Sequence, residues 1–138
     1  MQYSVLMSVY EKEQPLFFRE SLQSILRQSM PPAQIVVVCD GRLTDELYEV
    51  LADVQVDNPA LFTIVQLENR SGLGMALNQG MQHCRYEIIA RMDSDDIACP
   101  KRCEKQLELF HTNRNLAFCS GTIAEFSDER ELYTSAKT

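Results

Sequence analysis

The chain has 138 residues, of which 45% are hydrophobic and 24% charged, a composition that excludes disordered and fibrous proteins and predicts one globular domain, residues 1–138. Thirteen Lys and Arg residues against 20 Asp and Glu residues give a net charge of −7, so the long-range field repels nucleic-acid phosphates and anionic membranes. Nucleic acid is therefore not an expected partner, and an anionic ligand would need a metal ion or backbone N–H groups.

Apolar runs and helical patterns alternate from the first residues onward. Residues 3–9 predict a buried strand, and Pro15 suits the first turn of a helix that ends before Pro31. Residues 34–39 (QIVVVC) predict a second strand, which is too apolar for one half-exposed to water. These runs indicate parallel strands with helices between them.

The middle of the chain continues this alternation. Thr44 is expected to cap a helix, and residues 61–67 predict a third strand. Residues 69–72 form a turn signal, after which residues 73–84 show helical spacing, with Gly80 allowing close packing.

The last predicted elements surround an acidic run. Residues 87–92 predict a fourth strand that leads into Asp-Ser-Asp-Asp, and Pro100 opens another helix. Residues 116–120 predict a final strand, and the pattern fades beyond Phe126. The order predicts an α/β fold with three layers and a mostly parallel central sheet.

The chain has five cysteines, an odd number, and no signal-peptide pattern after Met1. These features predict reduced thiols and a cytoplasmic location, and the full-length protein could lie at the inner face of the membrane. No apolar run approaches the ~20 residues that cross a bilayer. Cys99 and Cys103 lie four residues apart, but the pattern lacks two further zinc ligands, so unligated thiols are favoured.

Acidic side chains follow three of the predicted strands. Tyr10 and Glu11 follow the first strand, Asp40 the second, and residues 93–96 the fourth. The carboxyl ends of parallel strands share one edge of a sheet, where ligands bind. Clustered carboxylates repel one another unless a cation compensates them, so this edge favours a divalent metal, and oxygen ligands suit Mg²⁺ or Mn²⁺.

Simpler interpretations of the same residues stay open. Residues 93–96 could be a solvated loop whose last aspartates cap the next helix, and Asp40 could be a turn residue before Gly41. A calcium-binding loop is disfavoured, because Ala98 stands where its sharp turn requires glycine and Pro100 supplies the wrong backbone.

Five sequence blocks in this order carry a resemblance. They are S-V-L-M-S-V-Y, S-I-L-R-Q-S, I-V-V-V-C-D-G, G-L-G-M-A-L-N-Q-G and A-R-M-D-S-D-D-I-A-C-P-K-R. Together they resemble the family 2 glycosyltransferases of the GT-A fold, and more narrowly the bacterial amylovoran-type enzymes that build polysaccharides. The resemblance implies a Rossmann-like GT-A sandwich that binds a nucleotide-diphosphate sugar, with a UDP-sugar favoured.

The resemblance also implies roles for particular residues. Ser8, Tyr10 and Glu11 fall where the family flanks the base, and Asp40 matches the second Asp of the family's D-D-G-S turn, which contacts the base. Cys39 replaces the first Asp, so the choice of nucleotide is not fixed.

In the family's D-x-D motif the first Asp lies near the ribose and the last binds the metal, which places Asp93 and Asp95 in these roles. Asp96 is expected to order the loop. The metal would neutralise the leaving diphosphate during transfer to a saccharide or lipid-linked acceptor.

In the family, the general base follows the D-x-D motif by a long interval. The late acidic residues of this chain follow the motif too closely to match that base, so no catalytic residue is identifiable in the chain (Glu125, Asp128, Glu129, Glu131). We therefore expect the donor-binding part of a longer enzyme, truncated before the acceptor-binding part. The alternatives are a non-catalytic nucleotide-sugar-binding module and a sugar nucleotidyltransferase. The second would need a Gly- and Arg-rich loop after the first strand, where this chain has V-Y-E-K.

Overall fold

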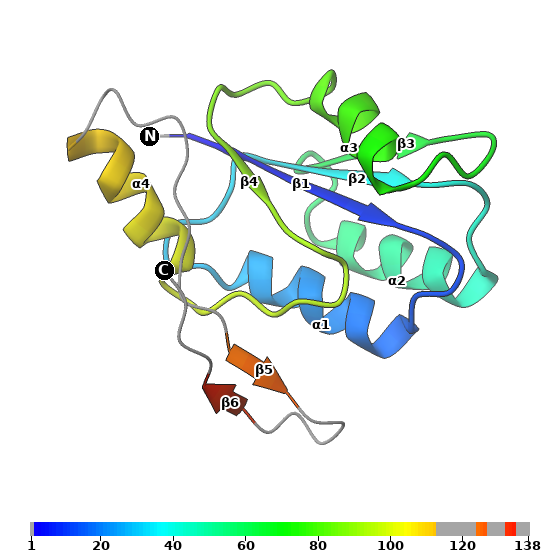
Figure 1. The fold of residues 1–138 in the computed structure, drawn as a ribbon, viewed down its shortest axis with the longest axis horizontal. Coiled ribbons are helices and arrows are strands. Elements are labelled where there is room, and N and C mark those ends of the chain that lie inside the picture. The colour runs from blue at the N-terminus through cyan, green and yellow to red at the C-terminus, as the bar shows by residue number, and fades with distance from the viewer. Residues whose placement is uncertain (1, 113–123, 127–131, 135–138) are drawn as a thin grey trace.

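The computed structural model describes residues 2–112, 124–126 and 132–134 and has a parallel sheet at its centre (Figure 1). The strand order is β3-β2-β1-β4, and every neighbouring pair in it is parallel. The carboxyl ends of the four strands therefore meet at one edge. The strands are β1 (Ser4–Val9), β2 (Gln34–Cys39), β3 (Phe62–Gln66) and β4 (Ile89–Arg91).

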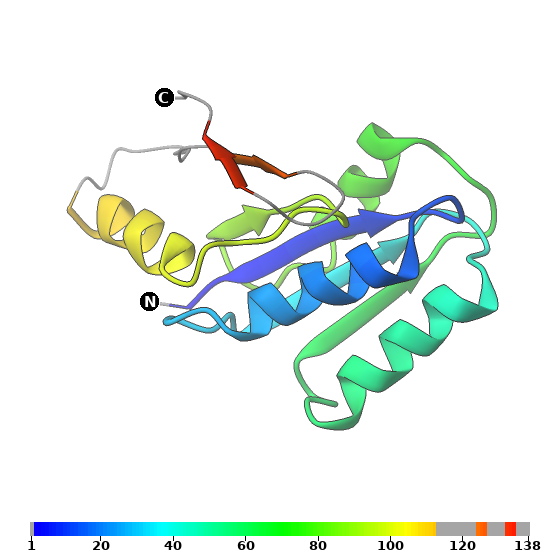
Figure 2. The same cartoon turned by 90° about the horizontal axis from the view of Figure 1, so that it is seen from below.

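Helices cover both faces of this sheet, which makes the three predicted layers (Figure 2). α1 (Pro15–Leu26) and α2 (Asp45–Val56) lie on one face, and α3 (Leu73–Met81) lies on the other. α4 (Arg102–Thr112) follows β4. Because successive strand residues point to opposite faces, β1 and β2 feed two apolar cores. The larger core includes Val5, Met7, Val9, Ile35, Val37, Phe18, Leu22 and Leu47, and the smaller one contains Leu6, Val36, Val38 and Ala76.

Two local features follow the sequence closely. The Thr44 hydroxyl accepts a hydrogen bond from the Leu47 N–H at 3.2 Å, which confirms the predicted cap of α2. A Cβ at Gly80 would lie 2.5 Å from the Leu6 side chain and 2.6 Å from that of Val38. Gly80 therefore lets α3 lie directly on the sheet, as predicted.

The predicted elements up to β3 are confirmed with small shifts at their ends, and two later elements are shorter than predicted. α3 ends at Met81 and not at residue 84, because the next N–H groups form tight turns: His83 donates to the Gly80 carbonyl, and Cys84 to that of Met81. β4 covers three residues and not 87–92, since it is an edge strand that pairs only with the first half of β1.

The C-terminal segment adds a second, small sheet. β5 (Ala124–Phe126) pairs antiparallel with β6 (Leu132–Thr134), and β6 lies in the stretch where the sequence pattern fades. Three residues are too few to show alternation, so β6 left no sequence signal. The strand predicted at 116–120 lies outside the described residues. Among the described helices, none is long and apolar enough to span a bilayer.

Candidate functional site

A cleft of about 260 Å³ opens where β1, β2 and β4 end. It brings together every residue predicted for the site except Glu11, which is exposed and does not line it. The predicted edge of the sheet is thus a single concave site. The cleft is lined by Ser8, Tyr10, Glu13, Asp40, Arg70, Leu73, Asp93, Ser94 and Asp95.

Asp40 follows β2, and its buried carboxylate accepts three hydrogen bonds from the loop before α3. Its Oδ1 accepts from the Ser71 N–H at 2.7 Å and from the Ser71 hydroxyl at 3.0 Å. Its Oδ2 accepts from the Gly72 N–H at 3.0 Å. Asp40 therefore fixes the loop that precedes α3, a structural role that sequence reasoning did not foresee.

The neighbouring Cys39 faces away from the cleft. It is fully buried in the larger apolar core, and this burial raises the pKa of its thiol to about 11. Cys39 is therefore a neutral core residue, so the substitution of the family's first aspartate leaves Asp40 as the carboxylate at this turn.

Arg70 stacks on Tyr10 across the cleft. Its guanidinium carbon lies 4.0 Å from the centroid of the Tyr10 ring, within the range of a cation–π contact. A Cβ on Gly41 would lie 3.0 Å from the Arg70 backbone nitrogen, and Gly41 has a φ of 87°. Gly41 thus lets the loop after β2 approach the loop that carries Arg70.

The acidic turn, residues 93–96, follows β4 and carries three exposed carboxylates. Oxygens of Asp93, Asp95 and Asp96 all lie within 4.8 Å of one another. Loss of hydration, followed by the negative charges of Asp93 and Asp95, raises the pKa of Asp96. The positive charge of Arg102 and a hydrogen bond with the Asp93 backbone act against this rise in the pKa of Asp96.

Ser94, the residue between the two aspartates of the D-x-D motif, also lines the cleft. Ser94 is buried, and its hydroxyl donates a hydrogen bond to the carboxylate of Glu13, which precedes α1. The turn therefore presents Asp93 and Asp95 to the solvent while Ser94 anchors it. Three close acceptor groups without a cation are a chemically suitable set for Mg²⁺ or Mn²⁺, which prefer oxygen ligands.

A sequence profile of the family described as glycosyl transferase family 2 matches residues 4–137. The chain belongs to glycosyl transferase family 2. This membership confirms the resemblance carried by the five sequence blocks, and it favours a transferase over a nucleotidyltransferase.

Two curated relatives of this family 2 chain have specific names. The amylovoran biosynthesis glycosyltransferase AmsE of Erwinia amylovora is 36% identical over 91% of the chain and 47% of its own length. The Escherichia coli UDP-Gal:alpha-D-GlcNAc-diphosphoundecaprenol beta-1,3-galactosyltransferase is 37% identical over 91% of the chain and 45% of its own length. The chain thus spans about half the length of these relatives.

Solved structures share the fold. S. aureus TarS 1-349 in complex with UDP-GlcNAc matches with a TM-score of 0.72 and 25% identity, over 83% of this chain and 32% of the TarS 1-349 chain. The mannosyltransferase PcManGT of Pyrobaculum calidifontis, in complex with GDP-Man and Mn²⁺, matches with a TM-score of 0.61 and 26% identity, over 70% of the chain and 28% of its own. The expected GT-A fold is therefore confirmed.

Four residues that line the cleft of this family 2 chain were not predicted as site residues: Glu13, Arg70, Leu73 and Ser94. Glu13 contacts Ser94, and Arg70 contacts Tyr10. The partners in each pair are far apart in the sequence, so no local pattern predicts these contacts. The carboxylate of Asp96 lies within the acidic cluster and its N–H donates to the Asp93 carbonyl, and the expected role of Asp96 in ordering the loop stays a prediction.

Proposed function

We propose that the chain binds the nucleotide diphosphate of a sugar donor, with a UDP-sugar favoured, in the cleft at the ends of β1, β2 and β4. The observation that carries the proposal is the charge of that cleft. Four carboxylates line it (Glu13, Asp40, Asp93, Asp95), and Arg70 is the one positively charged residue among the described residues that do so. A diphosphate placed there needs a cation.

The acidic turn supplies the ligands for that cation. Asp95 would hold a Mn²⁺ or Mg²⁺ ion, with Asp93 beside the ribose and Asp96 within reach of the same ion. Such an ion, once bound, neutralises charge on the diphosphate leaving group. The complex of PcManGT with GDP-Man and Mn²⁺ supports the use of a divalent ion by this chain.

The base would lie toward the ends of β1 and β2. An ionised carboxylate offers about four acceptor positions, and three hydrogen bonds occupy those of Asp40, so one acceptor position is left for the base. Ser8 lines the same cleft as Asp40. The Tyr10 ring and the Arg70 guanidinium stacked on it offer planar surfaces on which bases stack. Glu11 stays a prediction without support from the cleft.

We propose transfer to a saccharide or lipid-linked acceptor as the activity of the whole protein. The Escherichia coli relative, named for a diphosphoundecaprenol-linked substrate, supports this acceptor class, and AmsE supports a role in polysaccharide biosynthesis. The absence of the general base from this chain and its cytoplasmic location stay predictions. A non-catalytic nucleotide-sugar-binding module remains the alternative.

A panel of nucleoside diphosphates tests the donor-binding proposal. With Mn²⁺ present, UDP at about 100 times its dissociation constant should stabilise the fold by roughly 2.7 kcal/mol and raise the melting temperature by several degrees. The same titration in EDTA should give no shift. If no diphosphate shifts the melting temperature, or if the shift persists in EDTA, the proposed function is wrong.

A measurement of turnover distinguishes a glycosyltransferase from a non-catalytic nucleotide-sugar-binding module. The protein extended to the full length of its relatives should transfer sugar from the donor that binds this chain. Donor binding without any transfer by that longer protein would favour the non-catalytic module.

Replacement of Arg70 by alanine should weaken UDP binding by about tenfold. The substitution removes the guanidinium stacked on Tyr10 and the positive charge of the cleft. A hydrogen bond between charged groups contributes about 1.5–3 kcal/mol, and the lower value, suited to an exposed side chain, corresponds to about a factor of ten. Arg42→Ala is the matched control, because Arg42 also lies over a tyrosine ring, 5.9 Å from the Tyr48 centroid, but outside the cleft. Calorimetry with equal affinities for both variants would exclude a role for Arg70.

A further inference from the structure

α1 carries polar residues on a buried side. Ser21, Ser24 and Gln28, which follows the helix, are 0%, 8% and 4% exposed. Their spacing of three and four residues places them on one face. Buried polar groups need hydrogen-bond partners, and these three residues find theirs in the acidic turn and in the segment after it, residues 97–103.

The two serines hold the start of this stretch. The Ser21 hydroxyl donates to the Asp93 carbonyl at 3.2 Å. The Ser24 hydroxyl accepts from the Ala98 N–H at 2.9 Å and donates to the Ser21 carbonyl at 2.7 Å. The backbone on both sides of the three carboxylates is thereby fixed to α1.

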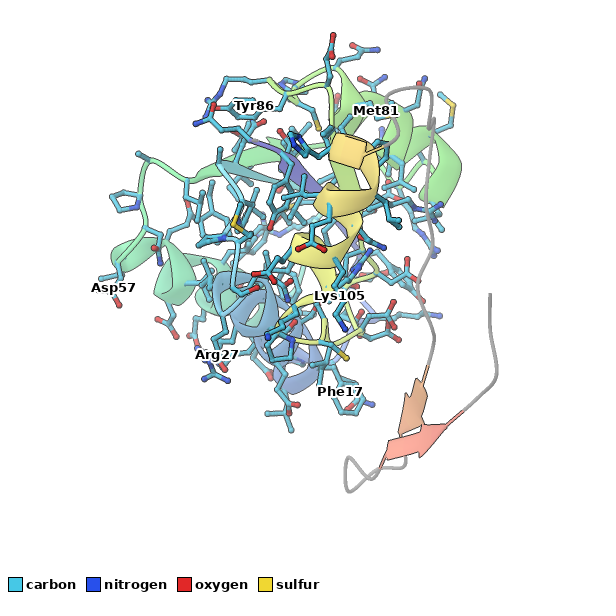
Figure 3. All side chains as sticks on the ribbon, turned by 90° about the vertical axis from the view of Figure 1, so that its left-hand side faces the viewer. Phe17, Arg27, Asp57, Met81, Tyr86 and Lys105 are labelled. Atoms are coloured by element: carbon cyan, nitrogen blue, oxygen red, sulfur yellow. The ribbon has the colours of Figure 1, made fainter. Side chains whose placement is uncertain are left out.

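Gln28 holds the end of the same stretch. Its side-chain N–H group donates to the Cys99 carbonyl at 2.7 Å, and its side-chain oxygen accepts from the Cys103 N–H at 2.9 Å. The Ser29 N–H donates to the Pro100 carbonyl at 2.8 Å. The chain after β4 accordingly runs along α1 to α4 (Figure 1), and the end of α1 near Arg27 lies beside α4 with Lys105 (Figure 3).

We propose that Ser21, Ser24 and Gln28 are positioning residues, which hold the acidic turn in the geometry that binds the metal and the diphosphate. The physical reason is that three carboxylates within 4.8 Å repel one another, so an unsupported exposed turn would spread apart before an ion arrives. The hydrogen bonds to α1 oppose that spreading, and the Ser94 hydroxyl bond to Glu13 adds a further anchor. This inference rests on the proposed donor-binding function.

The proposal gives a role to the S-I-L-R-Q-S block, which contains Ser24 and Gln28 but no cleft residue. Residues that orient metal ligands without touching the metal typically change metal affinity by about 10- to 100-fold when replaced. A residue that serves stability alone would change the melting temperature and leave the affinity of the folded protein intact. These two readouts therefore separate positioning from stability.

The test compares two buried glutamines. Gln28→Met removes the contacts with residues 97–103, whereas Gln34→Met removes an equally buried network to Ser4, Thr63, His83 and Arg85 that lies away from the acidic turn. Both variants should melt at lower temperature. At a temperature where both are folded, Gln28→Met should bind UDP with Mn²⁺ about tenfold more weakly, and Gln34→Met should bind like the unsubstituted protein.

Ser24→Ala provides a second variant if Gln28→Met does not fold, and it should lower Mn²⁺-dependent UDP affinity in the same direction. Unchanged affinity in the folded Gln28 or Ser24 variant would overturn the inference, as would an equal loss in Gln34→Met. If the unsubstituted protein shows no Mn²⁺-dependent UDP binding, the proposed function itself fails, which is a different outcome from intact binding in the variants.

Discussion

Replacement of Asp95 by asparagine is expected to reduce the Mn²⁺-dependent affinity for UDP by about 100-fold or more. The carboxylate would be lost from a cluster whose oxygens lie within 4.8 Å of one another, in a cleft with one guanidinium against four carboxylates. A 100-fold loss corresponds to about 2.8 kcal/mol of binding free energy, because each 1.4 kcal/mol is a factor of ten. Calorimetric titration of UDP with and without Mn²⁺ measures this loss.

Asp53→Asn is the matched control for Asp95→Asn. Asp53 is an exposed aspartate of α2 that pairs with Arg19 at 2.9 Å and does not line the cleft. Its replacement removes the same charge from the protein and should leave UDP affinity unchanged. Equal affinity for the Asp95 variant and the unsubstituted protein, or equal affinity after metal removal, would show that Asp95 does not hold a metal.

The layers of the fold could be predicted because each strand and helix has a local cause. The apolar run of β2 requires burial on both faces, Pro15 and Thr44 mark helix starts, and Gly80 permits α3 to approach the sheet. The position of the site follows from topology, since residues after parallel strands meet at one edge. That rule was sufficient to bring Asp40 near the acidic turn.

The contacts that organise the site could not be predicted in the same way. Ser94 and Glu13 are 81 residues apart, and Gln28 reaches the N–H of a residue 75 positions later. Such pairs depend on where the chain runs after β4, which the sequence pattern indicates only coarsely. The hydrogen bonds of Asp40 with Ser71 and Gly72 likewise need the packed loops, so its structural role became visible only in three dimensions.

Asp40→Ala is expected to lower the free energy of unfolding by about 3 kcal/mol. A hydrogen bond to a charged group contributes about 1.5–3 kcal/mol, and Asp40 accepts three while 4% exposed. The expected destabilisation is smaller than the sum of the three hydrogen-bond contributions, because Ser71 is exposed and water can take the place of part of the lost hydrogen bonding. Asp40→Asn keeps one acceptor oxygen, so its free energy of unfolding should lie between those of the unsubstituted protein and Asp40→Ala. Urea unfolding of the three proteins measures the series, with Glu68→Gln in a nearby exposed position as the control.

The Asp40 variants also distinguish the role of Asp40 from that of Asp95. Asp40 stands outside the group of three carboxylates, so Asp40→Ala should leave Mn²⁺ affinity unchanged while weakening UDP binding by about 1.5–3 kcal/mol. Part of that weakening comes through the loop that carries Arg70, because Asp40 fixes the residues directly after it. Asp40→Asn, which keeps more of the loop contacts, should therefore retain more UDP affinity than Asp40→Ala. An Asp40 variant that loses Mn²⁺ but still discriminates between bases would reverse the roles assigned to Asp40 and Asp95.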